Sequence, residues 1–203
     1  MRHDQHLRTA YPRLSDLLER VSPLENLTPQ PLPVAEAVTK IVVGQMLSRA
    51  AADTIYSRLA GIRARDELTG SWELPEAALL ACGLSRRKVR TIREFAICYE
   101  RDPSKFEAWR TLDHPELSAA VSEHWGLSQW SADMLAIFYF AMPDVFPGTD
   151  GTITRVQQIL EERYLLGPLD PELASPFRTA LARYMWALLD GGFLSSRGPS
   201  QVD

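Results

Sequence analysis

Proline and glycine residues punctuate this chain at intervals that fit α-helices, and this spacing limits the fold more than any other feature. Pro33 can occupy the first turn of a helix, and apolar residues then recur at helical spacing until Gly61. Inside this predicted helix Gly44 would cost about 1 kcal/mol relative to alanine, so we expect a close backbone approach there. No segment alternates apolar and polar residues with the β-branched enrichment of a strand. The sequence therefore predicts an all-α protein.

Capping residues mark the remaining helices. Pro75 is expected to open a short helix that ends at Gly83, and Ser85 has the short hydroxyl side chain of an N-cap. Pro115 is expected to open a helix whose C-terminal end is marked by Gly126. Three further helices are predicted from Trp130 to about Ala141, from Thr152 to Tyr164 and from Pro176 to Leu189.

The composition permits a large buried core. The chain has 203 residues, of which 45% are hydrophobic, and this suits one large domain or two small ones that share a core. No apolar run reaches the roughly 18 residues of a membrane span. The N-terminus also lacks the apolar stretch of a signal peptide. We therefore expect a cytoplasmic protein, and a monomer would suit the size.

The cysteines and histidines argue against a metal site. Cys82 and Cys98 cannot supply the four thiolates of an iron–sulfur cluster. His3 and His6 lie in a terminal segment that we expect to be mobile, and nothing nearby completes a tetrahedral site. The sequence thus predicts neither a metal nor another cofactor.

The stretch from Leu117 to Val156 carries the most informative pattern. It reads as a helix, the turn WGLS, a second helix, the loop MPDVFPGTDG and a third helix. Backbone N–H groups at a hairpin between two helix ends can bind a phosphate oxygen without reading sequence. The same pattern also fits an ordinary pair of packed helices with a glycine cap. These residues alone leave both interpretations open.

Asp150 stands directly before the third of these helices. Pro147, Gly148 and Thr149 precede it, and Gly151 follows. An aspartate in this place can serve as an N-cap worth about 1 kcal/mol. A carboxylate at a helix start can also be aimed at a reacting cation.

Four segments between about Val34 and Leu189 are informative when they are taken together and in order. They are KIVVGQMLSRAAADTIYSRLAG, CGLSRRKVRTIREFA, WGLSQWSADMLAIFYFAMPDVFPGTDGTITRV and ASPFRTALARYMWALL. In sequence and order they resemble the helix-hairpin-helix DNA glycosylases, and most closely the bacterial 3-methyladenine DNA glycosylase II group. The resemblance implies two helical subdomains with a cleft between them. The expected divisions are an N-terminal segment packed on the second subdomain (1–32), a first subdomain (33–141) with the helix-hairpin-helix at about 115–141, the catalytic aspartate loop and C-terminal helices (142–192), and a flexible tail (193–203).

The resemblance also assigns roles to individual residues. Asp150 stands at the family's essential aspartate, and Trp130 at a position that lines the base pocket, with Gln45 as a second pocket residue. Lyase relatives carry a nucleophilic lysine where Trp130 stands, so a monofunctional enzyme is implied. Met46 matches a residue that wedges into the base stack, although a methionine is also a common core filler. Further aromatic candidates for the pocket are Trp125, Phe138, Tyr139 and Trp186.

Two groups of residues are candidates for binding the DNA backbone. The resemblance implies the hairpin residues Gly126, Ser128, Ser131 and Ala132, although His124 to Ser128 lacks the proline and second glycine of the family's Leu-Pro-Gly-x-Gly turn. Arg86, Arg87 and Lys88 form a compact basic cluster despite the formal net charge of −4. A solvated helix start explains this cluster equally well.

The resemblance implies a monofunctional base excision repair enzyme whose partner is double-stranded DNA with a damaged base, acting in the cytoplasm at the nucleoid. The enzyme would extrude the damaged nucleotide and hydrolyse its N-glycosidic bond, leaving an abasic site. An alkylated purine is expected, because a cationic base leaves without a strong general acid and stacks well on indole. One alternative is the adenine-removing mismatch branch, which has a glutamate where Lys40 stands here and a cysteine cluster that this sequence lacks. The others are a non-catalytic DNA-binding protein of the same fold and a helical interaction protein with no DNA role.

Overall fold

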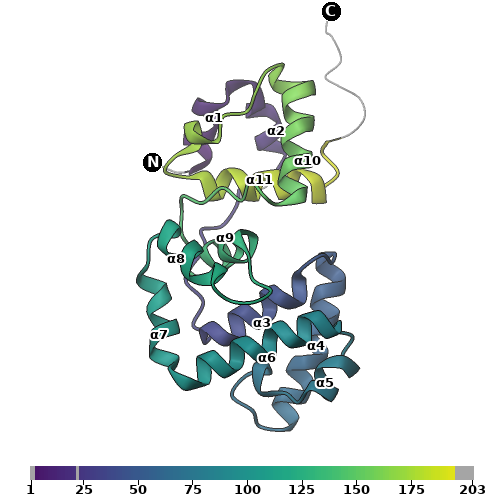
Figure 1. The fold of residues 1–203 in the computed structure, drawn as a ribbon. Coiled ribbons are helices and arrows are strands. Elements are labelled where there is room, and N and C mark those ends of the chain that lie inside the picture. Colours follow the sequence, from purple (N-terminus) through teal and green to yellow (C-terminus); the bar gives the residue numbers. More distant parts are fainter. Residues whose placement is uncertain (1–2, 22, 195–203) are drawn as a thin grey trace, which may run out of the picture. The chain divides into compact units, whose positions relative to one another are not determined.

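The computed structural model describes residues 3–21 and 23–194, and every regular element among them is helical (Figure 1). This confirms the predicted all-α class. The chain divides into two compact units, Met1–Leu27 with Met142–Asp203 and, between them in the sequence, Thr28–Ala141. The predicted flexible tail, 193–203, lies outside the described residues from position 195 onward. Among the described residues, no helix has both the length and the apolar character that crossing a bilayer requires.

The unit Thr28–Ala141 is built around α3, which packs against α4, α6 and α9 (Figure 1). Nine of the eleven residues of α3 are buried, Glu36 and Thr39 among them, so this helix is enclosed on nearly all sides, as a central helix must be. Phe95, Phe106 and Trp109 form an aromatic cluster with His124 at the start of the hairpin turn. Its helices are α3 (Val34–Gly44), α4 (Arg49–Arg65), α5 (Glu76–Ala81), α6 (Arg86–Arg101), α7 (Pro103–Glu107), α8 (His114–Ser122) and α9 (Gln129–Phe138), with 3-10 turns at Ser71–Glu73 (η2) and Ala108–Thr111 (η3).

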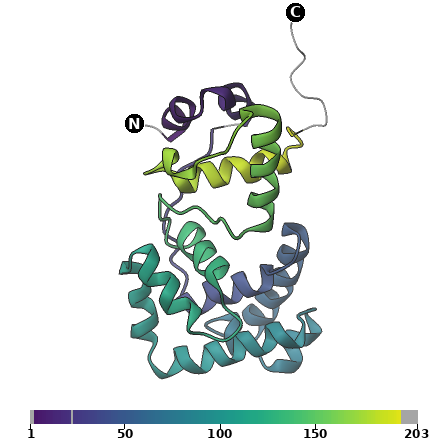
Figure 2. The ribbon, with the colours of Figure 1, turned by 45° about the horizontal axis from the view of Figure 1, so that its top comes forward.

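The other unit joins the two ends of the described chain. Leu7, Leu14 and Leu18 from the N-terminal helices share one apolar core with Ile153 and Leu181 from the C-terminal ones. Figure 1 and Figure 2 show that these N-terminal and C-terminal helices lie side by side. Its elements are α1 (His3–Ala10), α2 (Ser15–Arg20), α10 (Gly151–Leu160) and α11 (Arg178–Asp190), with short turns at Pro12–Leu14 (η1), Glu161–Leu165 (η4) and Pro171–Ala174 (η5).

The prediction that His3 and His6 lie in a mobile terminus was wrong. Both belong to α1, and a ring nitrogen of His6 lies 3.1 Å from the carbonyl oxygen of Leu173. The His6 ring also packs edge-on against Phe177, at a centroid distance of 5.3 Å. The apolar burial of Leu7 explains the difference, because it attaches α1 to the core of its unit.

The predicted continuous helix from Pro33 to Gly61 is two helices. α3 ends at Gly44, and α4 begins at Arg49 and runs past Gly61 to Arg65. The expected close approach at Gly44 was also wrong, because a Cβ atom there would meet nothing within 4 Å. The helix ends in a tight turn instead.

The boundaries predicted for α5 and α6 agree with the structure. Ser85 is the N-cap of α6, and its hydroxyl accepts a hydrogen bond from the backbone N–H of Lys88. Pro75 directly precedes α5, and Gly83 follows it with a φ of +104°. Local capping chemistry therefore fixes these boundaries, as the sequence indicated.

Candidate active site and DNA-binding elements

The carboxylate of Asp150 is held at the N-terminus of α10. Its Oδ1 atom accepts hydrogen bonds from the backbone N–H groups of Thr152 and Ile153, at 3.0 and 2.9 Å. The indole N–H of Trp186 in α11 donates a third bond to the same oxygen, at 3.2 Å. Asp150 is therefore an N-cap, and its half-buried side chain is also oriented from a second helix. From the sequence, Trp186 was only a further aromatic candidate for the base pocket. The sequence gave no signal for its hydrogen bond to Asp150.

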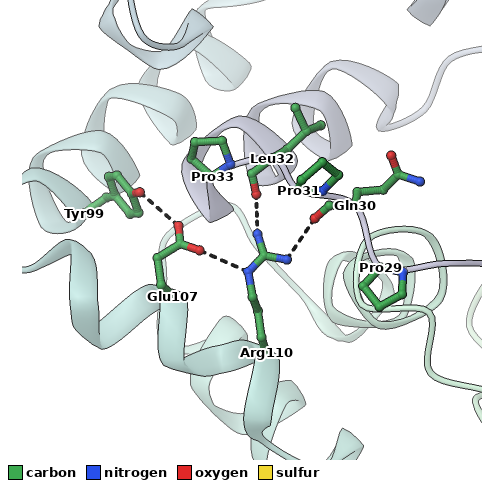
Figure 3. A pocket seen from close by; sticks show the side chains of 8 residues that line it. All are labelled: Pro29, Gln30, Pro31, Leu32, Pro33, Tyr99, Glu107 and Arg110. Atoms are coloured by element: carbon green, nitrogen blue, oxygen red, sulfur yellow. Dashed lines mark hydrogen bonds and ion pairs between the residues drawn. The ribbon is translucent and has the colours of Figure 1, made fainter.

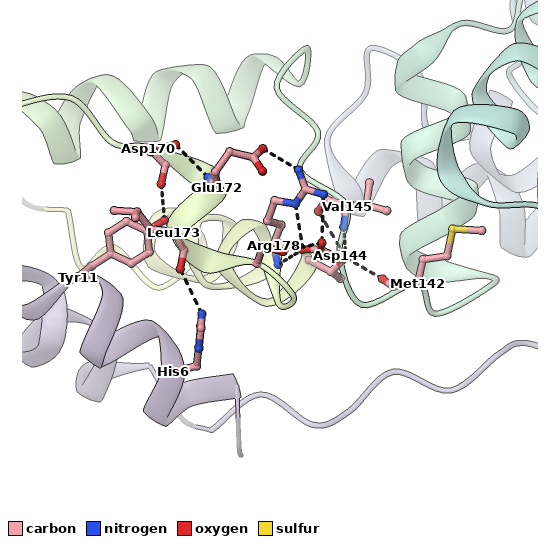
Figure 4. Close-up of polar contacts among 11 residues, drawn as sticks. His6, Tyr11, Met142, Asp144, Val145, Asp170, Glu172, Leu173 and Arg178 are labelled. Carbon is pink, nitrogen blue, oxygen red and sulfur yellow. Dashed lines mark hydrogen bonds and ion pairs between the residues drawn. The ribbon is translucent and has the colours of Figure 1, made fainter.

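The loop before Asp150 is anchored to the start of α11 (Figure 4). Asp144 binds the Arg178 guanidinium through both carboxylate oxygens, at 2.9 and 3.0 Å, and these bonds lower the pKa of Asp144 despite its partial burial. The hydroxyl of Thr179 donates to the carbonyl of Met142 and accepts from the N–H of Val145. These contacts fix the path of the chain that leads to Asp150.

The α3–α4 turn (Gly44 to Leu47) presents Met46 to solvent. The N–H of Leu47 donates to the carbonyl of Gly44 at 3.2 Å, with Gln45 at φ −52° and ψ 127° and Met46 at φ +56°. These values describe a type II turn, in which a residue other than glycine or asparagine at the Met46 position is strained. The Met46 side chain is 100% exposed. Core filling, the alternative reading of this methionine, was therefore wrong.

Gln45 connects this turn to the helical hairpin formed by α8 and α9. Its side-chain Nε2 donates to the carbonyl oxygen of Gly126 at 3.1 Å and lies 3.4 Å from the hydroxyl of Ser131. The same Ser131 hydroxyl accepts from the backbone N–H of Ser128 at 3.3 Å. Gln45 therefore links the α3–α4 turn to the hairpin.

Gly126 is required by the shape of the hairpin turn. Its φ is +78°, and a Cβ atom there would lie 2.1 Å from the hydroxyl oxygen of Thr91 on α6. Ser128 is exposed, whereas Ser131 and Ala132 are buried at 2% and 0% exposure. The N–H of Ala132 donates within α9 to the carbonyl of Ser128. Of the four hairpin residues predicted from the sequence, Gly126 and Ser128 are accessible to a ligand. Ser131 and Ala132 are buried and stabilise the turn from inside the unit.

The basic cluster at the start of α6 is not uniform. Arg86 and Arg87 are exposed, whereas Lys88 is partly buried and its Nζ donates to the carbonyl of Val43 at 2.8 Å. Burial lowers the pKa of the Lys88 ammonium group. Both arginines are therefore accessible to a polyanion, although the guanidinium of Arg87 also lies 6.0 Å from the centre of the Trp125 ring, and Lys88 already has a hydrogen-bond partner in the protein.

The aromatic candidates lie in different settings. Trp130, in the first turn of α9, is half-buried, and Phe138 at the end of the same helix is 38% exposed. Trp125 is an exposed residue of the hairpin turn whose ring carries the guanidinium of Arg90 at 4.1 Å. Tyr139 lies 5.9 Å from the ammonium of Lys40, and burial raises its pKa above the usual value.

A separate hollow of about 550 Å³ lies beside the segment Pro29–Pro33 (Figure 3). Arg110 binds the carbonyl groups of Gln30 and Leu32, and Glu107 accepts from the N–H of Val34, so the polar groups satisfy one another. Burial and the bond to Glu107 raise the pKa of Tyr99 to about 12. This hollow anchors the chain that enters α3.

No set of three or more His, Cys, Asp or Glu side chains within residues 3–21 and 23–194 is arranged to hold a metal ion. The chemistry available at Asp150 is that of a fixed carboxylate beside an indole.

The helical fold, the aspartate at a helix start and the glycine-containing hairpin are the features that the resemblance to the DNA glycosylase class implied. Comparison with curated proteins gives the DNA-3-methyladenine glycosylase 1 of Schizosaccharomyces pombe, 30% identical over 163 residues that cover 74% of this chain and 70% of the relative. The alkylbase DNA glycosidase-like protein mag2 of the same yeast is 26% identical over 92% of each chain. The chain therefore belongs to the 3-methyladenine DNA glycosylase family.

Solved structures agree with this assignment. The 3-methyladenine DNA glycosylase of S. pombe in complex with abasic DNA superposes with a TM-score of 0.74 at 25% identity, over 94% of this chain and 97% of that one. The fold is also shared with the DNA-3-methyladenine glycosidase of Bacillus halodurans, at TM-score 0.67 and 22% identity over 90% and 88% of the two chains. No protein-family model matches the chain.

Proposed function

We propose that this protein is a monofunctional, helix-hairpin-helix DNA glycosylase of the 3-methyladenine II type that removes alkylated purines from double-stranded DNA. The observation that carries the proposal is the fixation of one Asp150 carboxylate oxygen by two backbone N–H groups and the Trp186 indole. A carboxylate oriented in this way needs little rearrangement when charge develops next to it. The S. pombe relatives, named for 3-methyladenine and for alkylated bases, support the substrate class.

In the proposed mechanism Asp150 acts on the sugar. Breaking the N-glycosidic bond develops positive charge on the deoxyribose, comparable to the oxocarbenium-like state of glycoside hydrolysis. The carboxylate stabilises this charge or accepts a proton from the attacking water. The bond electrons leave with the base, and an alkylated purine accepts them readily because it already carries a positive charge.

Trp130 supports both the substrate class and the monofunctional outcome. Its half-buried indole offers a surface on which a cationic base can stack, worth about 0.5–2 kcal/mol. Its position holds no amine that could form a Schiff base with the sugar. The product is therefore an abasic site with an intact strand.

The residues that handle the duplex are on the unit Thr28–Ala141. Met46, fully exposed on a strained turn, is the proposed wedge that fills the space of the extruded nucleotide. The backbone around Gly126 and Ser128 and the exposed Arg86 and Arg87 are the proposed phosphate contacts. These contacts position the duplex without selecting a sequence.

A cleavage assay on a panel of lesions tests this proposal. Duplexes with 3-methyladenine, 7-methylguanine, hypoxanthine, ethenoadenine or uracil are incubated with the protein, and abasic sites are revealed by alkali. We expect release of the cationic alkylpurines and strand breaks only after alkali. A covalent adduct trapped by borohydride would contradict the monofunctional mechanism, and release of no lesion at all would contradict the enzyme assignment.

A further inference from the structure

The ammonium group of Lys88 completes the end of α3. The last four carbonyl groups of a helix have no partner within it, and that of Val43 receives the Lys88 Nζ at 2.8 Å. A cation in this place also interacts favourably with the negative end of the helix dipole. Lys88 is itself held, because its backbone N–H donates to the N-cap hydroxyl of Ser85 at 3.4 Å.

The carbonyl that Lys88 binds lies directly before the α3–α4 turn. Val43 is buried at 0% exposure, and Met46, three residues later, is fully exposed with a positive φ. A left-handed residue other than glycine costs about 1–2 kcal/mol and persists where neighbouring contacts determine the conformation. The contacts of the turn are therefore what keep Met46 projecting into solvent.

A second contact of this turn, made by Gln45, also connects it to α6 through the hairpin. Gln45 binds the carbonyl of Gly126, and Gly126 packs tightly against Thr91, one helical turn after Lys88 on α6. The side chains of Lys88 and Gln45 thus attach the turn on both sides. The end of α3, the hairpin and the first turns of α6 are therefore connected to one another beside the turn that carries Met46.

We propose that Lys88 is a positioning residue that holds the α3–α4 turn so that Met46 can enter the base stack, and that it is not a contact to a DNA phosphate. The inference rests on the wedge role of Met46 in the proposed function. Arg86, two residues earlier in the first turn of α6 and exposed, supplies a matched comparison with the same loss of charge.

The test uses a duplex with a tetrahydrofuran abasic analogue beside 2-aminopurine, whose fluorescence rises when its stacking is lost. At saturating protein, K88M is expected to lose most of the wild-type rise, while the slope of log K against log salt is unchanged because no phosphate contact is lost. Its single-turnover release of 3-methyladenine is expected to fall about tenfold or more, as misplaced groups do. R86M is instead expected to raise Kd and to reduce the slope of log K against log salt by about 1.

Two further variants separate positioning from general damage to the fold. K88R keeps a cationic donor and is expected to retain part of the fluorescence rise. Q45M removes the other attachment and is expected to reproduce the K88M pattern, independently of any base contact because the probe has no base at the lesion. DNA affinity and thermal melts report whether each variant is folded.

The possible results distinguish this inference from the proposed function. A K88M variant that behaves like R86M, or that keeps the full fluorescence rise, overturns the role of Lys88 while base release by the wild type leaves the function standing. A wild-type protein that neither raises the fluorescence nor releases a base overturns both.

Discussion

The indole N–H of Trp186 donates a hydrogen bond to the Oδ1 atom of Asp150 at 3.2 Å, and this bond joins the middle of α11 to the start of α10. The same oxygen already accepts two backbone N–H groups. Three donors on one oxygen hold this oxygen in place more firmly than N-capping alone. This arrangement allows the capping and catalytic roles of Asp150 to be separated by mutation.

Asp150→Asn is expected to lower base release at least about a hundredfold, the order seen when a preorganised group aimed at a transition state is removed. The asparagine oxygen can still cap α10, since Asn and Asp are comparable N-caps. Melting temperature and DNA affinity should therefore change little. Single-turnover rates beside binding curves measure this, and a near wild-type rate would leave Asp150 with only its capping role.

Trp186→Phe is expected to keep the ring and lose the bond to Asp150. A hydrogen bond to a charged group contributes about 1.5–3 kcal/mol, so we expect base release to fall about tenfold or more. If Trp186 acts through Asp150, the substitution should have little further effect in an Asp150→Asn background. Fully additive losses in this double-mutant cycle would show that Trp186 acts on the substrate by another route.

Trp130→Ala is expected to slow the release of charged lesions more than the release of neutral ones. If the indole stacks on the extruded base, release of cationic alkylpurines should lose about 0.5–2 kcal/mol more than release of hypoxanthine. A core tryptophan would instead cost about 3–5 kcal/mol of folding stability and lower all activities alike. Its half-buried position favours the first result. Thermal melts together with rates on one charged and one neutral lesion decide between them.

The two glycines Gly126 and Gly61 are expected to respond to alanine in opposite directions. Gly126→Ala combines a positive φ with a collision against Thr91 and should destabilise the protein by about 2–4 kcal/mol. Gly61 is exposed inside α4 with nothing within 4 Å of its Cβ position, so Gly61→Ala should stabilise by about 0.5–1 kcal/mol. Denaturant unfolding of both variants measures the difference, and equal shifts would contradict the description of the hairpin.

Features that depend on neighbouring residues in the sequence were predictable. The N-cap at Ser85 and the helical class follow from short-range capping and periodicity. The break after Gly44 was missed because the apolar spacing continues across it, and a methionine at positive φ has no local signal. The hydrogen bond from Lys88 to Val43 spans 45 residues of the sequence, and the one from Trp186 to Asp150 spans 36. Such contacts depend on packing that periodicity does not specify. The predicted cleft between the subdomains stays a prediction.

Met46→Gly is expected to lower activity without lowering stability, which is uncommon for the loss of a large apolar side chain. The side chain is fully exposed and its φ is +56°, so glycine removes strain of about 1–2 kcal/mol and no packing. The greater freedom of glycine in the unfolded chain offsets about 0.4–1 kcal/mol of this gain. The free energy of unfolding should therefore stay the same or rise slightly.

Base release by the same variant should fall, because an apolar wedge of this size contributes about 1.5–3 kcal/mol when it is buried in the base stack. That corresponds to about a ten- to hundredfold loss of rate. Met46→Leu keeps an apolar side chain and is the matched control, expected to retain most of the activity. Urea unfolding and single-turnover rates on a 3-methyladenine duplex measure both quantities. A destabilised Met46→Gly protein would contradict the strained, exposed turn, and an undiminished rate would remove Met46 from the proposed mechanism.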